Sequence, residues 1–226
     1  MRGRPPAARP DAGPPRVLIL GIGNLLWADE GFGVRVVEVL QQRWRFPAQV
    51  ALLDGGTQGL NLLDRVRAAD ILVVFDAIDY GLSPGTLMRV EGDEVPKYLG
   101  AKKMSLHQTG FQEVLALAAL LGEFPKNLLL IGVQPVELDD YGGSLRPAVK
   151  AQIEPAIALA LAYLADFGIV AETCPDSTAD PLGGLTHPSL ALAPYEAERP
   201  SAAAAYRRGD ARVLSRLRTR SGRVEQ

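Results

Sequence analysis

Acidic residues and one histidine follow several apolar runs of this sequence, and their types are those that bind divalent metal ions and activate water. Asp29 and Glu30 stand in "GNLLWADEG", Asp54 opens "DGGT", Asp76 ends "VVFD", and His107 lies in "SLHQTG". Carboxylates provide hard oxygen ligands and histidine provides a nitrogen ligand. Such a set suits nickel, zinc or a similar ion and leaves coordination positions open for water or substrate. These residues therefore indicate a metal site, provided that the fold brings them together.

Five short apolar runs are typical of strands, and they stand at 17–21, 49–57, 71–75, 85–92 and 127–135. The runs at 17–21, 71–75 and 127–135 are typical of strands buried in a parallel sheet, whereas 85–92 alternates and is expected at an edge. The strands alternate with helical patterns. We therefore expect an α/β fold, with a doubly wound, mostly parallel sheet and helices on both faces in three layers.

Helical periodicity occupies the segments between these runs, beginning at Gly33 and again at 58–68, 108–121 and 147–167. In the first of these helices, polar residues such as Arg35 and Glu38 alternate with apolar ones, which is typical of an amphipathic surface helix. Pro155 interrupts the last pattern, so we expect a kink or a restart of the helix there.

The topology explains why the candidate residues should meet. In open α/β sheets ligands bind at the carboxyl ends of the strands. Asp29 and Glu30 follow the first strand, Asp54 ends the second, Asp76 ends the third, and His107 directly precedes a helix. We therefore expect these residues to converge on one edge of the sheet.

A nucleotide site is the first alternative, because Gly21-x-Gly23 follows a buried strand and precedes a helix. The third glycine of the dinucleotide pattern is replaced by Leu26, and Asp54 lies too far along the chain to be its acidic residue. Asp29 and Glu30 would also repel a pyrophosphate. These differences disfavour a nucleotide-dependent enzyme, although the fold would permit one.

Each candidate also has a purely structural interpretation. Asp54 and Asp76 are residue types that often cap turns, and Glu30 suits the first turn of a helix. His107 is placed where it could cap or pack a helix. Only the expected convergence at one sheet edge favours a functional site.

Length and composition limit the organisation and the function classes. The 226 residues have a formal net charge of −2 and one cysteine, which argue against nucleic-acid binding and allow no intrachain disulfide. We expect a Pro/Arg-rich extension at 1–15, one domain at 16–168, and a largely disordered tail at 169–226 with a short helix near 206–217. The N-terminus lacks a secretory apolar region. We expect a cytoplasmic monomer that does not insert into a membrane.

Several stretches, in order over about residues 16–168, resemble the hydrogenase maturation endopeptidases (peptidase family M52), most of all those for uptake hydrogenases. They are "LGIGNLLWADEGFGVRVVE", "LLDGGTQGLNLL", "VVFDAIDYG", "PGTLMRVEGDEVP", "SLHQTGFQEVLALAALLGEFPKNLLLIGVQP" and "IEPAI". The resemblance implies a phosphorylase/hydrolase-like fold. It also implies a hydrolase, sometimes classed as aspartic-type, that removes a short C-terminal peptide from the precursor of the large subunit of a nickel–iron hydrogenase.

The resemblance implies roles for particular residues. Glu30, Asp76 and His107 would bind nickel, which the precursor itself would supply, and Asp54 and Asp76 would be catalytic. Asp54 is then a candidate general base for the attacking water. A non-enzymatic nickel chaperone or checkpoint protein, with the same three ligands, is the alternative.

Overall fold

The computed structural model describes residues 13–100, 106–174, 185 and 187–200, but not the side chains of residues 100 and 106–109. Its centre is a five-stranded sheet in the order β3-β1-β4-β6-β5. The bounds of these strands are β1 (Val17–Ile22), β3 (Val50–Gly56), β4 (Ile71–Ala77), β5 (Leu87–Glu91) and β6 (Asn127–Val133). The first four in that order are parallel, and β5 is antiparallel to β6 at one edge, as predicted.

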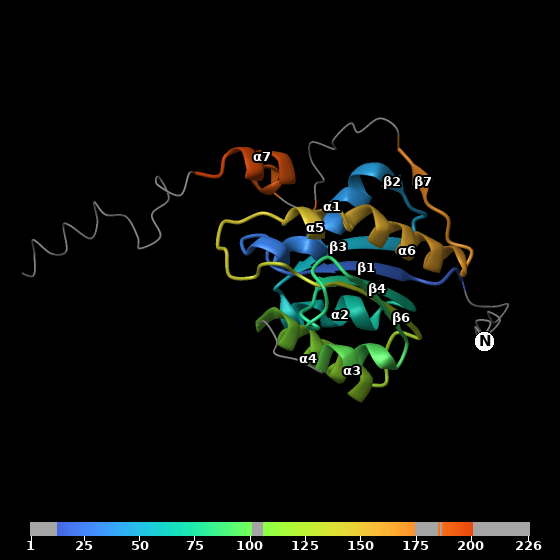
Figure 1. Ribbon diagram of the computed structural model, residues 1–226. Helices are drawn as coiled ribbons and strands as arrows, with labels where there is room; N and C mark the ends of the chain where they lie inside the picture. Colours follow the sequence, from blue (N-terminus) through green and yellow to red (C-terminus); the bar gives the residue numbers. More distant parts are fainter. Residues whose placement is uncertain (1–12, 101–105, 175–184, 186, 201–226) are drawn as a thin grey trace, which may run out of the picture.

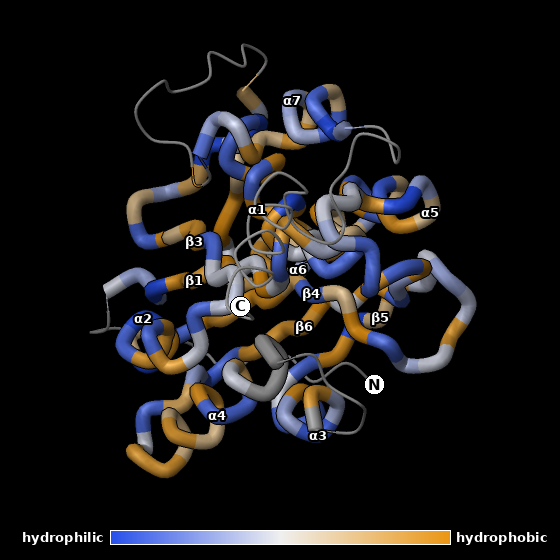
Figure 2. The backbone as a smooth tube through the Cα atoms, turned by 90° about the vertical axis from the view of Figure 1, so that its left-hand side faces the viewer, coloured by the Kyte–Doolittle hydropathy of each residue, from blue (hydrophilic) through white to orange (hydrophobic). Residues whose placement is uncertain are grey.

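Helices cover both faces of the sheet, which confirms the three-layer α/β fold (Figure 1). On one face lie α1 (Phe32–Arg43), α5 (Pro147–Lys150) and α6 (Ile153–Ala165). On the other face lie α2 (Leu63–Arg67), α3 (Glu94–Gly100) and α4 (Leu106–Leu120). Every residue of β1 and β4 is buried, because both strands are enclosed by the two helical layers. Figure 2 looks along the sheet and shows the hydrophobic strands between these layers.

The last predicted helix is divided. Helix α5 ends at Lys150, α6 begins at Ile153, and Pro155 is the third residue of α6, where a missing backbone N–H does no harm. The predicted restart is therefore confirmed. By length and composition alone the stretch Pro147–Ala165 would be able to cross a membrane, but residues such as Ala156 and Ala160 pack in the core next to α1.

Part of the segment predicted to be disordered forms defined structure. Strand β7 (Glu172–Thr173) pairs antiparallel with β2 (Trp44–Arg45), and a 3-10 turn η3 (Pro188–Leu190) leads into α7 (Leu192–Ala197). These elements are too short to produce a recognisable periodicity. Helix α3 was also not predicted. The expected helix near 206–217 and most of the N-terminal extension lie outside the described residues.

Candidate active site

Glu30 is positioned by a tight turn at the end of β1. It lies in the 3-10 helix η1 (Ala28–Gly31), and its carbonyl accepts a hydrogen bond from the backbone N–H of Asn24 at 3.2 Å. A Cβ atom at Gly23 would lie 1.8 Å from the Glu30 carbonyl oxygen, and Gly23 has a φ of +135°. The glycine is therefore required because η1 folds back onto β1. It shapes the turn, and its presence does not indicate a phosphate site.

Backbone strain accompanies this turn. Ala28, directly before the two acids, has a φ of +38°, and no other non-glycine residue among those described has a positive φ. Such a conformation persists only when surrounding contacts enforce it, and it is common at functional sites.

Asp29 provides those contacts, because its buried carboxylate binds the loop that follows β6. Its two oxygens accept backbone hydrogen bonds of 2.6–2.9 Å from Val136, Glu137 and Arg146. The rings of Trp27 and Tyr141 meet edge to face at 5.2 Å and join the same two loops. Asp29 therefore positions Glu30 by holding the 136–146 loop, and its side chain is fully occupied by that structural role.

Asp76 is the penultimate residue of β4 and is 1% exposed. Its Oδ1 accepts the backbone N–H of Ala77 at 2.8 Å. The loop beyond it is held by buried Gln134, whose side-chain oxygen accepts the N–H groups of Tyr80 and Leu82 at 2.8 and 3.1 Å. Gln134 was not predicted, because an amide directly after an apolar strand has no pattern that reveals its partners.

Asp54 lies at a bulge in β3. Gly21 of β1 pairs with Asp54, but Ile22 pairs with Gly56, so Gly55 is an extra residue in β3. Burial raises the pKa of the Asp54 carboxyl, and a hydrogen bond from the backbone N–H of Gly56 opposes this in part. A half-buried carboxylate with a raised pKa is a stronger base than a fully solvated one.

The register separates the two aspartates. Gly21 pairs with Asp54 on one side and with Phe75 on the other, and successive side chains of a strand point to opposite faces. Phe75 belongs to the core on the α1 face. Asp54 is therefore directed to the α1 face and Asp76 to the α4 face. The predicted convergence on one edge is confirmed for these residues, but they do not share a face.

His107 lies in the first turn of α4, on the same face of the sheet as Asp76. Its side chain is outside the described residues, so its ligand role remains a prediction. Among the described residues no group of three His, Cys, Asp or Glu side chains is arranged to hold a metal ion. Of the predicted ligand set, only Glu30 and Asp76 have described side chains.

One prediction about α1 is wrong. Arg35 and Glu38 are not on a solvated face but are 2% and 5% exposed, and they form an ion pair of 2.8 Å. The C-terminal segment covers them, since Arg35 also donates to the carbonyl of Leu190 at 2.6 Å. Their opposite charges at i,i+3 spacing were the one feature of the sequence that could have indicated this ion pair.

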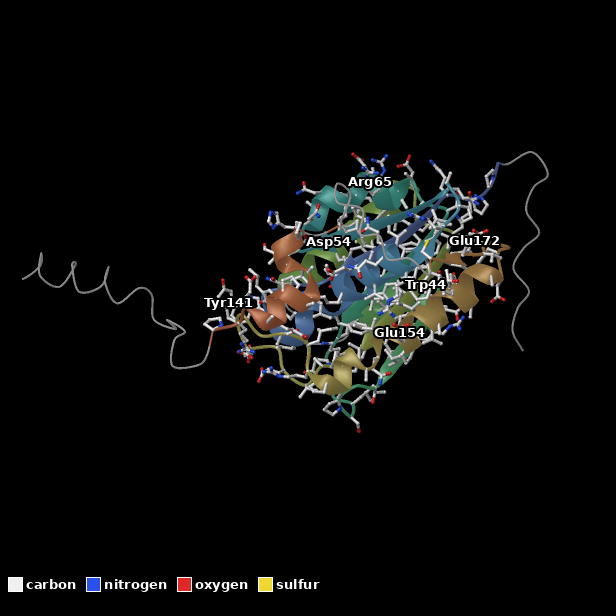
Figure 3. The ribbon with its side chains drawn as sticks, turned by 90° about the horizontal axis from the view of Figure 1, so that it is seen from above. Trp44, Asp54, Arg65, Tyr141, Glu154 and Glu172 are labelled. Atoms are coloured by element: carbon white, nitrogen blue, oxygen red, sulfur yellow. The ribbon has the colours of Figure 1, made fainter. Side chains whose placement is uncertain are left out.

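Figure 3 shows Asp54 toward the end of the molecule where α7 lies, whereas Trp44 and Glu172 mark the other end.

Comparisons with known proteins agree with this arrangement. A family model described as "Hydrogenase maturation protease" matches residues 34–163. The hydrogenase expression/formation protein HupD of Thiocapsa roseopersicina is 68% identical over 207 residues, which cover 92% of this chain and 93% of that protein. The hydrogenase 2 maturation protease of Escherichia coli is 46% identical over 157 residues, which cover 69% of this chain and 94% of that protein.

Solved structures show the same fold. The hydrogenase maturating endopeptidase HybD from E. coli has a TM-score of 0.67 and 44% identity, and the match covers 70% of this chain and 97% of that one. The fold and these comparisons thus define the class of protein, which is an endopeptidase with an α/β fold. The chain belongs to the hydrogenase maturation protease family.

Proposed function

We propose that this enzyme removes a short C-terminal peptide from the precursor of the large subunit of a nickel–iron hydrogenase after nickel has been inserted. The observation that carries the proposal is that Asp54 and Asp76 lie near the carboxyl ends of the two strands that flank β1, with Glu30 in the turn η1 that follows β1, in a chain of this family. The names of the relatives as proteases favour cleavage over the non-enzymatic nickel chaperone.

Nickel enters this reaction as part of the substrate. Glu30 and Asp76, together with His107, would provide two oxygen ligands and one nitrogen ligand from η1, β4 and α4, a donor set that suits nickel. Binding of the precursor's nickel by these residues would admit a loaded precursor and reject an empty one.

Asp54 performs the proton transfers in the proposed mechanism. Its carboxylate takes a proton from a water molecule, whose oxygen attacks the scissile carbonyl carbon. When the C–N bond breaks, the proton passes from Asp54 to the leaving nitrogen, and the carboxylate is regenerated. The raised pKa of Asp54 makes it a better base than a fully solvated aspartate.

The test compares purified precursor with and without nickel and follows its C-terminus by mass spectrometry. We expect shortening of the loaded precursor only. Equal cleavage of both forms would contradict the nickel requirement, and nickel transfer with no shortening would favour the chaperone.

We also propose that the enzyme is a cytoplasmic monomer. Light scattering tests its oligomeric state, and cell fractionation tests its location.

A further inference from the structure

The C-terminal segment 187–200 (η3 and α7) is anchored to three separate parts of the domain. Glu196 binds Lys150 Nζ at 2.8 Å and Ser144 Oγ at 2.8 Å. Arg199 donates to both carboxylate oxygens of Asp140 at 2.9 Å. The third anchor is on α1. The segment therefore has a defined position, beside the loop that Asp29 holds.

The anchor on α1 is the buried Arg35–Glu38 pair. The carbonyl of Leu190 accepts a hydrogen bond from Arg35, and the ring of Tyr195 lies over the guanidinium group, 5.5 Å from its carbon to the ring centroid. These contacts form a clamp around Arg35. The side chains of Arg35 and Glu38 are 3% and 7% exposed. Because buried ion pairs are often no more stabilising than apolar residues of similar size, stability alone does not account for the pair.

The same pair lies on the helix that packs against β3, the strand of Asp54. Both side chains belong to α1, the helix on the face to which Asp54 is directed. Glu38 raises the pKa of Asp54 and Arg35 lowers it. The other neighbours of Asp54 among the described residues are uncharged: β1 contributes Gly21, the loop contributes the N–H of Gly56, and Gln58 donates its amide to the Asp54 carbonyl at 2.9 Å.

Comparison of chain lengths identifies the segment as an addition to a shorter enzyme. The match to the T. roseopersicina protein spans 207 residues and extends well beyond Gly168. The E. coli protease matches over 157 residues, which are 94% of its length, so it is too short to have a counterpart of the whole segment after Gly168.

We propose that Arg35 and Glu38, buried on the helix that packs against β3 on the face of Asp54, are positioning residues for Asp54, and that the η3–α7 segment holds Arg35 in place through Leu190 and Tyr195. The inference rests on the proposed function, since it concerns the residues that position Asp54, the general base of the proposed mechanism. It makes the C-terminal segment a part of the catalytic apparatus in the longer enzymes.

The first experiment compares two variants of the full-length protein, each of which lacks one member of the ion pair. Arg35→Gln and Glu38→Gln both break the same buried bond, so a merely structural role would affect them alike. We expect Arg35→Gln to move the Asp54 titration and the acid limb of the cleavage rate to higher pH, and Glu38→Gln to move both to lower pH. The carboxyl carbon-13 resonance of Asp54, assigned with Asp54→Asn, reports the titration without any substrate.

The second experiment tests the clamp and does not require the ion pair to be broken. Tyr195→Leu removes the ring face over Arg35, whereas Tyr195→Phe keeps it. We expect Tyr195→Leu to shift the Asp54 resonance titration in the direction of Arg35→Gln, and Tyr195→Phe to titrate as the parent enzyme does. Identical titrations for the two variants would overturn the clamp.

Shifts of Arg35→Gln and Glu38→Gln in the same direction, or no shift in either, would overturn the positioning role. Failure of the parent enzyme to cut nickel-loaded precursor would instead contradict the proposed function. The resonance titration would still decide the inference in that case, so the two failures are distinguishable.

Discussion

Asp54 and Asp76 lie near the carboxyl ends of the two strands that flank β1, yet they are directed to opposite faces of the sheet. Asp76 is on the face of α4, whose first turn contains His107, and Asp54 is on the face of α1, the helix that contains Arg35 and Glu38. A peptide lying across the end of β1 would contact the metal-binding group on one side and the base on the other. This separation leads us to expect different consequences when each carboxylate is removed.

Asp54→Asn should retain binding of nickel-loaded precursor but lose cleavage, by about 10²–10⁴-fold, the usual contribution of a general base. Asp76→Asn should lose both, because a proposed nickel ligand is removed. Capture of the precursor on immobilised enzyme measures binding, and mass spectrometry measures cleavage. Equal loss of binding in the two variants would contradict the division of roles.

Asp54 should also reduce the stability of the enzyme at neutral pH. Its pKa is raised in the folded state, so the folded protein binds the proton more tightly than the unfolded chain. The resulting stabilisation is full below the pKa of the unfolded state and is lost as pH rises through the raised pKa. Asp54→Asn keeps an oxygen for the Gly56 N–H and should therefore raise Tm at pH 7.

Thermal unfolding at a series of pH values checks this prediction. The difference in Tm between the parent and Asp54→Asn should shrink as the pH is lowered through the titration of Asp54. The cleavage rate of the parent should fall over the same interval, because a protonated Asp54 cannot act as a base. A variant that is less stable than the parent at pH 7 would argue against a desolvated carboxylate.

The sheet was predictable from the sequence because strands such as β1 and β4 are buried on both faces and read as unbroken apolar runs. The parallel order of the strands allowed us to predict the edge of the sheet at which Glu30, Asp54 and Asp76 lie. The face of the sheet to which Asp54 and Asp76 are directed could not be predicted, because it depends on the strand register and on the bulge at Gly55. The burial of Arg35 was also not predictable, because the segment that covers it is distant in sequence and has no periodicity of its own.

Asp29 should be far more important for stability than its exposed neighbours in the 136–146 loop. Asp29→Ala leaves three backbone N–H groups without their acceptor in a part-buried site, and we expect a cost on the order of 3–5 kcal/mol. Asp139→Ala, in an exposed part of the same loop, is the matched control and should change stability by about 0.5 kcal/mol or less. Urea unfolding measures both. Similar values for the two variants would refute the anchoring role.

Gln134 should govern the order of the loop after Asp76. Gln134→Leu removes the acceptor for Tyr80 and Leu82 and the donor to Asp79 at 3.0 Å, with an expected cost of about 2–3 kcal/mol. Hydrogen exchange of residues 79–82 should accelerate. Gln42→Leu, on the exposed part of α1, should leave that exchange unchanged. Unaltered protection in Gln134→Leu would show that the loop is held by other contacts.

The partners of the Asp29 carboxylate lie 107, 108 and 117 residues further along the chain. During synthesis, β1, β3, β4 and β6 all leave the ribosome before Arg146 does, so a nascent chain possesses the sheet before it can fix η1. Until then the Asp29 carboxylate lacks the backbone N–H donors that hold it in the folded protein, and these contacts cannot enforce the strained conformation at Ala28. The turn that positions Glu30 can therefore be fixed only late in translation. A chain that ends before Arg146 would contain Glu30, Asp54 and Asp76 but would lack a contact that holds Glu30 in place.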